Sequence, residues 1–401
     1  MSEFLQQIRV DFGFPVCFTQ DVFAPDNPVL ARVVARLEPH KLHQALFVVD
    51  QGVADAAPAL IPSIHAYCET HRDTLKLLGP PLLVPGGEAV KNDVAHVLDL
   101  VEHVNRLGID RHSYLVVVGG GAVLDMACFA AAISHRGVRC VRLPTTVLSQ
   151  DDSGVGVKSG INLFGKKNFM GAFMPPFAVV NDIKFMDTLP KRDKIAGLSE
   201  AVKVAVIRDA AFFRYLETHA ARLAKGEVDA LAYTIRRSAE LHMEHMRTGG
   251  DPFEMGSARP LDYGHWTAHK MEAITHHRLR HGEAVAMGMA LDTVYAVKRG
   301  LLKPEAGERV LKVMEAIGLS LWDEEYLTRD GSGELVVLQG LREFREHLGG
   351  ELHITLLREI GQGFEVTEMD EATIVDAIHA LQARADGWGN GRGAPVAAAG
   401  G

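Results

Sequence analysis

Apolar and polar positions change pattern several times along the first half of the chain. Residues 1–20 alternate apolar and polar side chains and predict an edge strand or hairpin, and residues 45–50 form a short apolar run typical of a buried strand. Residues 54–71 and 94–107 carry apolar side chains at helical spacing. Helices and strands therefore alternate in this half of the chain.

A glycine triplet follows the most apolar of these predicted strands. Residues 113–133 read SYLVVVGGGAVLDMACFAAAI, which predicts a strand, a glycine turn and then a small-residue helix containing Asp125. Glycines let the backbone approach a pyrophosphate closely, and a helix N-terminus offers free amides to it. The pattern indicates a phosphate cradle, although it is not the GxGxxG fingerprint and also suits a tight turn.

The next segment, 138–173, is polar and rich in glycine, and we predict a long loop without regular structure. Such loops in compact domains are usually functional. Its lysines and asparagine suit a phosphate monoester; the polar residues of interest are Asp152, Lys158, Lys166, Lys167 and Asn168. The alternative, a solvated charged loop, fits less well with the apolar residues embedded in it, which include Val155, Ile161, Leu163, Phe164 and Phe169.

Helical periodicity dominates the second half of the chain. It extends to about residue 384 and predicts a helical second domain, followed by a low-complexity tail that we expect to be disordered. The predicted domains are residues 1–187, 188–384 and a tail of 385–401.

Five of the 19 histidines lie between Leu261 and Gly282. His265 and His269 share one face if residues 266–274 are helical, and His281 precedes a new apolar run that it caps or opens. A catalytic zinc needs three protein ligands and an open position. Histidines that merely decorate a polar helix face are the alternative, but this density favours a metal site.

An acidic third ligand is available in the stretch GLSEAVKVAVI. Glu200 and Lys203 stand three residues apart on an apolar helix and would face one site. A surface ion pair is the alternative at this spacing. Asp50, at the end of the strand 45–50, is similarly placed either to accept ribose hydroxyls or to cap a helix.

Composition narrows the class of protein. The chain has 401 residues, 47% of them hydrophobic, and a net charge of −9, which argues against nucleic acid as the main partner. The four cysteines show no CxxC spacing and are interpreted as buried free thiols. The N-terminus has no signal-peptide pattern and no segment is long and apolar enough for a membrane span, so we expect a cytoplasmic protein without a membrane partner.

Six motifs, taken in order, resemble those of 3-dehydroquinate synthases and the wider sugar phosphate cyclase superfamily. They are GGGAVLD, PTTVLSQDDSGVGVKSG, GKKN, TLPKRDKIAGLSEAVK, DYGHWTAHKMEAI and HGEAVAMGM. The spellings DPFEMGSARPLDYGHWTAHK and FREHLGGELHITLL are most similar to the cyclase-like member of bacterial ebo gene clusters.

The resemblance implies an α/β Rossmann-like N-terminal domain that binds NAD and an all-α C-terminal domain that holds zinc, with cobalt as a possible substitute. It assigns the metal to Glu200, His265 and His281, and catalytic roles to Asp152, Lys158, Asn168, Lys203 and His269. NAD contacts fall to Asp50, Glu88, Lys91, Gly120, Gly121, Asp125, Thr145, Thr146, Lys167, Thr188 and Leu189. Arg136, Asp262 and Arg345 are assigned to the substrate, with Arg136 near the interface of a homodimer.

The implied reaction is transient oxidation of a phosphorylated ketose, phosphate elimination, re-reduction and aldol closure to a carbocycle. Two alternatives stay open: 3-dehydroquinate synthase proper, and a metal-dependent polyol dehydrogenase of the glycerol dehydrogenase type. A non-catalytic binding protein would be expected to lack part of the metal triad, and no part is missing.

One departure from the family bears on the substrate. The family meets the heptulosonate carboxylate with an arginine and a lysine before the first zinc histidine, but these positions hold Ala258, beside Arg259, and the lysine-free stretch 241–245. Asp262 also replaces the usual asparagine. The substrate is therefore expected to be a phosphorylated sugar without a carboxylate.

Overall fold

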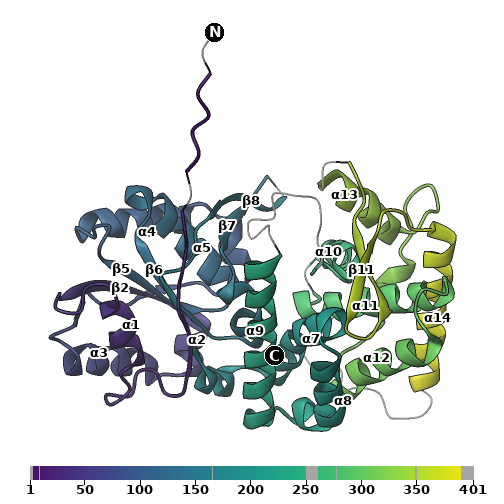
Figure 1. The fold of residues 1–401 in the computed structure, drawn as a ribbon, viewed down its shortest axis with the longest axis horizontal. Helices are drawn as coiled ribbons and strands as arrows, with labels where there is room; N and C mark the ends of the chain where they lie inside the picture. Colours follow the sequence, from purple (N-terminus) through teal and green to yellow (C-terminus); the bar gives the residue numbers. More distant parts are fainter. Residues whose placement is uncertain are drawn as a thin grey trace. The chain divides into compact units, whose positions relative to one another are not determined.

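A computed structural model describes residues 3–8, 10–164, 166–249, 261–276, 278–347 and 350–389. The chain divides into two compact units (Figure 1). Unit 1 contains Met1–Thr145 and Ser153–Thr188, and unit 2 contains Thr146–Asp152 and Leu189–Gly401. The short segment Thr146–Asp152 belongs to unit 2, and the predicted domain bounds stay a prediction.

Unit 1 is built on a sheet of seven strands, all paired in parallel. The strand order is β1-β9-β6-β5-β2-β3, and β4 pairs with the second half of β2. The strands are β1 (Val16–Thr19), β2 (His43–Asp50), β3 (Leu75–Leu77), β4 (Leu82–Val84), β5 (Tyr114–Gly119), β6 (Arg139–Pro144) and β9 (Ala178–Asp182). Of residues 1–20, predicted as an edge strand or hairpin, the described residues form a strand only over Val16–Thr19, and this strand lies at the edge of the sheet.

Helices cover both faces of this sheet (Figure 1). They are α1 (Val29–Ala35), α2 (Gln51–Ala56), α3 (Leu60–Thr70), α4 (Ala95–Arg106) and α5 (Gly121–Ile133). Leu46 and Val48 of β2 pack in one core cluster with α4 and α5, whereas Phe47 contacts Phe23 on the other face, where Tyr67 of α3 also packs. Because both faces of β2 are buried, its sequence is a continuous apolar run rather than an alternating one.

Two predictions for this unit need correction. The helix predicted over 54–71 is interrupted, because Pro58 disfavours helical backbone at Ala57, which has ψ 77°. The segment 138–173 is not an irregular loop: it contains β6, α6 (Val147–Asp151) and an antiparallel hairpin. The hairpin strands are β7 (Lys158–Leu163) and β8 (Lys166–Phe173).

The prediction of four free thiols is wrong for two of them. Cys128 on α5 and Cys140 on β6 form a disulfide, with their Cα atoms 6.0 Å apart, whereas Cys17 and Cys68 are free. Packing of α5 against the sheet brings the two cysteines together, which their spacing in the sequence does not reveal.

Unit 2 is helical, as predicted, with the addition of one antiparallel hairpin formed by β10 (Ile354–Glu359) and β11 (Gln362–Val366). Its longer helices are α7 (Lys191–Arg208), α8 (Ala210–Lys225), α9 (Val228–Thr248), α10 (His265–Ile274), α11 (His281–Lys298), α12 (Pro304–Ile317), α13 (Gln339–His347) and α14 (Glu371–Gly389). Helix α14 continues past residue 385, where the tail was predicted to begin; residues 390–401 lie outside the described part.

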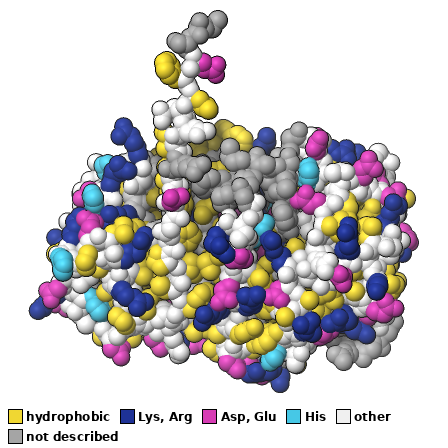
Figure 2. Space-filling model, viewed as in Figure 1, with side chains coloured by type: hydrophobic (Ala, Val, Ile, Leu, Met, Phe, Trp, Pro, Cys, Tyr) yellow, Lys and Arg dark blue, Asp and Glu magenta, His cyan; other side chains and the backbone are white. Residues whose placement is uncertain are grey.

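Helices α7 and α11 form the centre of unit 2. The part of α7 from residue 196 to 207 and most of α11 are buried on every side, which explains why apolar and small residues dominate these stretches. None of the helices in the described ranges combines the length and apolar composition that a bilayer-spanning helix needs. On the face drawn in Figure 2, side chains of both charges are interspersed, so the net negative charge is not gathered there.

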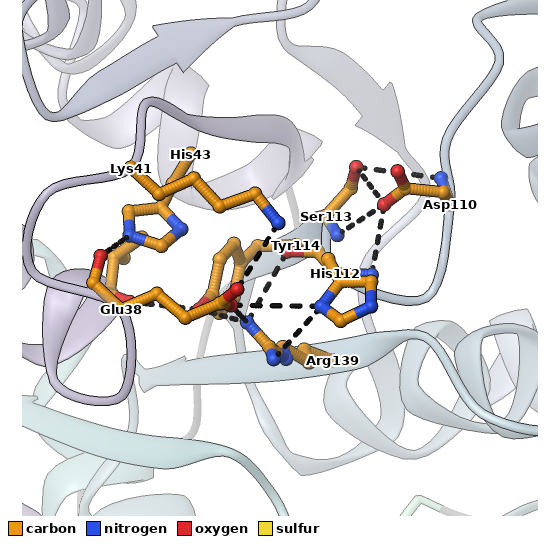
Figure 3. A network of polar contacts seen from close by, with 9 residues as sticks. Glu38, Lys41, His43, Asp110, His112, Ser113, Tyr114 and Arg139 are labelled. Atoms are coloured by element: carbon orange, nitrogen blue, oxygen red, sulfur yellow. Dashed lines mark hydrogen bonds and ion pairs between the residues drawn. The ribbon is translucent and has the colours of Figure 1, made fainter.

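A polar network joins the amino-terminal ends of three neighbouring strands in unit 1 (Figure 3). Glu38 accepts hydrogen bonds from Arg139 at the start of β6 (2.9 Å) and from Lys41 (3.3 Å). The same Arg139 nitrogen donates to the hydroxyl of Tyr114 at the start of β5 (2.9 Å), and His43 at the start of β2 bonds to the Glu38 carbonyl (3.0 Å). Glu38 is therefore a link between strands.

We predict that Glu38→Gln removes stability that depends on pH. The hydrogen bond from Arg139 is the main cause that lowers the pKa of Glu38 from 4.5 to about 2. A carboxylate with a lowered folded-state pKa stabilises the fold above its unfolded pKa and loses this contribution as the pH falls toward the folded value. The stability difference between wild type and variant should therefore be largest near neutral pH and shrink between about pH 4.5 and pH 2.

Denaturant unfolding from pH 7 downward measures this difference. Glu69→Gln on α3 is the matched control, because Glu69 pairs only with its exposed neighbour Arg72 among the described residues. A Glu38→Gln deficit that stays constant from pH 7 to pH 3 would contradict the prediction.

Candidate functional site

Three helices of unit 2 each contribute one ligand-type side chain to a single place. Glu200 lies in the middle of α7, and His265 and His281 are the first residues of α10 and α11. One ligand atom from each lies within 4.8 Å of the other two. The expected convergence of these three residues is therefore present in the structure.

Hydrogen bonds orient both imidazoles. His265 Nδ1 lies 3.2 Å from the carbonyl oxygen of Tyr263, and His281 Nδ1 lies 3.2 Å from a carboxylate oxygen of Glu272. Because these oxygens act as acceptors, each Nδ1 carries the proton and each Nε2 keeps a free lone pair for a metal.

Glu272 was not predicted from the sequence, although a signal for it existed. It lies seven residues after His265 on α10, which places it on the same helix face. Its side chain is buried and so is held beside the His281 ring.

The three residues fit a zinc ion. Glu200 is 2% exposed, and its carboxylate Oε1 has no hydrogen-bond partner within the described structure. Its Oε1 lies 4.0 Å from His265 Nε2, and its Oε2 forms an ion pair with Lys203. A buried carboxylate oxygen that faces an imidazole lone pair needs a cation between them, and one carboxylate with two imidazoles is a zinc donor set.

Lys203 is a buried cation among carboxylates. Burial disfavours its charge, but Glu200, Asp152 and Asp262 outweigh burial and raise its pKa, so Lys203 stays protonated. Burial and the nearby charge of Lys203 lower the pKa of His265 well below its usual range, which keeps this ring neutral and able to bind a metal.

Two adjacent carboxyl groups at the end of α6, those of Asp151 and Asp152, have pKa values shifted in opposite directions. Burial opposes the charge of Asp152, but His242 on α9, 2.9 Å away, and Lys203 lower its pKa. Asp151 is 1% exposed and neither of its oxygens has a hydrogen-bond partner in the described structure. Burial and the charge of Asp152 raise the pKa of Asp151 well above its usual range, which favours its protonated form. His242 and Asp151 were both missed, although their stretches SQDDS and LHMEH were visible in the sequence.

The remaining predicted residues of unit 2 lie at different distances from the triad. The His269 ring lies 5.7 Å from the His265 ring and 6.2 Å from the His281 ring, between centroids, so it belongs to the cluster. Asp262 is half-buried and close enough to Lys203 to raise its pKa. Arg345 is exposed on α13. Ala258 and Arg259 lie outside the described residues.

In unit 1, the predicted cofactor residues follow the carboxyl ends of adjacent strands. Asp50 ends β2, Gly120 follows β5 and Thr145 follows β6. Ligands of parallel α/β sheets bind at this edge. The Asp50 carboxylate accepts a hydrogen bond from Gly52 N (2.8 Å) and so caps α2, and burial raises its pKa although nearby backbone amides oppose this. Because the Asp50 carboxylate is engaged in this cap, a contact between Asp50 and a ribose stays a prediction.

The start of α5 forms a cradle whose polar groups lack partners. A Cβ atom added to Gly121 would lie 2.7 Å from the Ser153 hydroxyl, so only glycine keeps this space open. The hydroxyls of Ser153 and Thr145 are buried without hydrogen-bond partners in the described structure. Unpaired hydroxyls beside free helix amides fit the pyrophosphate of NAD.

A second cluster in unit 1 is centred on the buried ammonium of Lys91. It donates to Asp125 (2.7 Å) and to the side-chain oxygen of Asn168 (2.5 Å), and it lies 3.9 Å from Glu88. Burial raises the pKa of Asp125, against the effect of Lys91. Asn162, which was not predicted, donates to Glu88 (3.0 Å) and accepts from the Asn168 backbone amide (2.8 Å).

The other predicted residues show local contacts or exposure. The Thr146 side chain caps α6, and the Thr188 hydroxyl donates to the Phe185 carbonyl (2.7 Å). Leu189 is half-buried. Lys158, Lys167 and Arg136 are exposed, and Arg136 has a positive φ of 63°. The predicted residues thus include the metal cluster of unit 2, the α5 cradle and the Lys91 cluster of unit 1, and a remainder with other local contacts or exposed side chains.

Comparisons with known proteins bear on the family to which the chain belongs. The sequence models for the N-terminal and C-terminal domains of 3-dehydroquinate synthase match residues 81–196 and 197–332. A 2-epi-5-epi-valiolone synthase from Streptomyces glaucescens is 34% identical, over 91% of this chain and 88% of the relative. A 3-dehydroquinate synthase from Shewanella sp. is 31% identical, over 93% of this chain and 99% of the relative.

A solved structure has the same fold. The 2-epi-5-epi-valiolone synthase from Streptomyces hygroscopicus subsp. jinggangensis, with NAD+ and Zn2+ bound, matches with a TM-score of 0.83 and 27% identity, over 95% of this chain and 100% of that chain. The predicted fold class, a parallel α/β domain followed by a helical domain, is confirmed. Together, the two domain matches and the extent of these likenesses show that the chain belongs to the 3-dehydroquinate synthase family.

Proposed function

We propose that this protein is a sugar phosphate cyclase that uses NAD and zinc and acts on a phosphorylated ketose. The observation that carries the proposal is the buried Glu200, whose carboxylate oxygen faces the free Nε2 of His265 without a partner. Both relatives are named as synthases of carbocycles, and the 2-epi-5-epi-valiolone synthase structure contains NAD+ and Zn2+. A carbon–oxygen lyase is the enzyme class that follows.

The proposed reaction has four stages. One hydroxyl of the sugar is oxidised to a ketone, which acidifies the neighbouring C–H; phosphate is eliminated, the ketone is reduced again, and the released enol closes the ring by aldol addition. When bound, NAD takes up and returns the hydride and zinc polarises the reacting oxygen. The chain's own residues bind, orient and exchange protons.

Glu200, His265 and His281 would hold the metal, while the Tyr263 carbonyl and Glu272 keep each imidazole in the required tautomer. Lys203 remains charged and so can donate a hydrogen bond to a substrate oxygen. Asp151 is buried beside Asp152, and its raised pKa suits it to hold a proton close to the ionised Asp152.

For the phosphate, the family resemblance supplies Lys158, Asn168, Arg136 and His269. The side-chain oxygen of Asn168 is occupied by Lys91, so its NH₂ group is the part that remains to donate to a phosphate. NAD would be held by the α5 cradle with Thr145, and by the Lys91 cluster with Glu88 and Asp125.

The substrate is proposed to lack a carboxylate. Carboxylates of Glu200, Asp152 and Asp262 surround Lys203, and their charges are what raise its pKa. In the lysine-free stretch 241–245, His242 pairs with Asp152, with 2.9 Å between His242 Nδ1 and Asp152 Oδ1. A substrate carboxylate would meet negative charge, whereas hydroxyl groups would donate hydrogen bonds to these oxygens.

The runner-up is 3-dehydroquinate synthase, favoured by the Shewanella relative, which is nearly as similar to this chain as the valiolone synthase. The subgroup of bacterial ebo clusters, a cytoplasmic location and a homodimer with Arg136 at its interface stay predictions. The exposure of Arg136 on its turn is compatible with such an interface.

We predict that His265→Ala abolishes stoichiometric zinc binding, because it removes one of the three ligands. Elemental analysis after exhaustive dialysis should find one zinc per wild-type chain and much less in the variant. His379→Ala on α14, which changes an exposed histidine away from the triad, is the control and should keep its zinc. Wild-type zinc content in His265→Ala would show that the ligand set is wrong.

NAD is predicted to be recycled, since the hydride taken in the oxidation returns in the reduction. Phosphate release should therefore proceed through many turnovers without net NADH, followed by nicotinamide absorbance alongside a phosphate assay. Steady accumulation of NADH with a simple polyol would favour the dehydrogenase alternative instead.

A phosphorylated heptulose should be converted in preference to the heptulosonate phosphate. Loss of one charge-assisted contact costs about 1.5–3 kcal/mol, or roughly one to two decades, so kcat/KM should differ by at least about tenfold. Asp262→Asn should narrow this preference by removing one of the carboxylates that repel the acid. Efficient conversion of the heptulosonate phosphate, with neutral heptulose and hexose phosphates inert, would identify a dehydroquinate synthase.

A further inference from the structure

A buried carboxylate lies in the middle of α11 and is hydrogen-bonded to the residues on either side of His265. Asp292 is 0% exposed and forms no ion pair within the described structure. Its two oxygens accept one hydrogen bond each, from Gly264 N (2.9 Å) and from Trp266 Nε1 (3.0 Å). Burial raises the pKa of Asp292 to about 7, against the effect of these two donors. Keeping such a group inside a core is costly, which calls for a reason.

The two donors stand on either side of His265. Gly264 immediately precedes α10, and Trp266, which is 1% exposed, is the second residue of that helix. Asp292 therefore binds the backbone before the histidine and the side chain after it. No other described side chain bonds to both of these neighbours.

The same turn lies directly on α11. Gly264 has a φ of 79°, and a Cβ atom added to Gly288 would lie 2.0 Å from the Gly264 carbonyl oxygen. The Tyr263 hydroxyl also donates to the Met289 carbonyl (3.2 Å). The turn has little freedom to shift along α11 while these contacts persist.

The orientation of the His265 ring depends on this turn, because its Nδ1 donates to the carbonyl of Tyr263. A change in the peptide at Gly264 would move that carbonyl and rotate the ring. Asp292 holds this peptide by its N–H group.

We propose that Asp292 is a positioning residue that fixes the His265 imidazole in its metal-binding orientation through Gly264 and Trp266. This inference rests on the proposed metal site. Asp292 itself does not touch the metal, and its effect is transmitted by the two hydrogen bonds. A group hydrogen-bonded directly to a metal-binding histidine contributes about 10–100-fold to metal affinity, and Asp292 acts one step further out, so its effect should lie near the lower end of this range.

Cobalt binding separates positioning from general stability, because the visible absorption of bound cobalt reports ligand geometry. We would measure metal affinity by chelator competition, the cobalt spectrum and the melting temperature for wild type, Asp292→Ala, Asp292→Asn and Trp266→Phe. Leu216→Ala changes a fully buried side chain of α8 and is the matched control: it should lower stability while keeping the two hydrogen bonds to Asp292.

Asp292→Ala should weaken cobalt binding about tenfold and change the spectrum. Trp266→Phe, which loses one of the two bonds, and Asp292→Asn, which keeps one acceptor oxygen, should show smaller changes of the same kind. Leu216→Ala should melt at a lower temperature yet bind cobalt with the wild-type affinity and spectrum.

Wild-type affinity and spectrum in Asp292→Ala would overturn the inference, whatever its melting temperature. If that variant does not fold, unchanged cobalt binding in both Trp266→Phe and Asp292→Asn would overturn it equally. A wild-type protein that binds no metal would instead overturn the proposed metal site on which the inference rests.

Discussion

The close approach of three helix backbones in unit 2 is the constraint on which the site depends. A Cβ atom added to Gly282 would lie 1.9 Å from the Ala196 carbonyl oxygen, so the first turn of α11 touches α7 directly. In the same way, a Cβ atom added to Gly288 would lie 2.0 Å from the Gly264 carbonyl oxygen, so the start of α10 touches α11 directly. Since α7, α10 and α11 each carry one ligand, these contacts bring Glu200, His265 and His281 within bonding reach of one ion.

Charge is the second constraint. Glu200, Asp152 and Asp262 place more negative than positive charge around Lys203, and Asp151 adds a carboxyl group whose protonated form burial favours. An apo site of this kind is costly, because buried charges need partners. A divalent cation would balance these carboxylates, which is a further reason why the site fits zinc.

Much of this arrangement could be predicted from local sequence. The histidine spacing and the apolar run after His281 correctly placed α10 and α11, and the apolar run ending at Asp50 placed β2. These features depend on residues close together in the chain. Glu200 was suggested by its spacing from Lys203, but its choice over a surface pair needed the family motifs.

Contacts between distant segments could not be predicted. The pairing of Asp152 with His242 joins residues on α6 and α9, and the Cys128–Cys140 disulfide joins a helix to a strand. The glycine-rich segment was taken for a loop because its lysines and glycines hid the strand pairing between β7 and β8. Only the folded chain shows which of these residues meet.

The most direct test of the account is anomalous diffraction from crystals grown with zinc and measured on both sides of the zinc absorption edge. The account predicts one anomalous peak per chain, at about 2.0–2.2 Å from a Glu200 oxygen and from Nε2 of both His265 and His281. A zinc ion bound elsewhere, or held by His269 in place of one of these three residues, would contradict it.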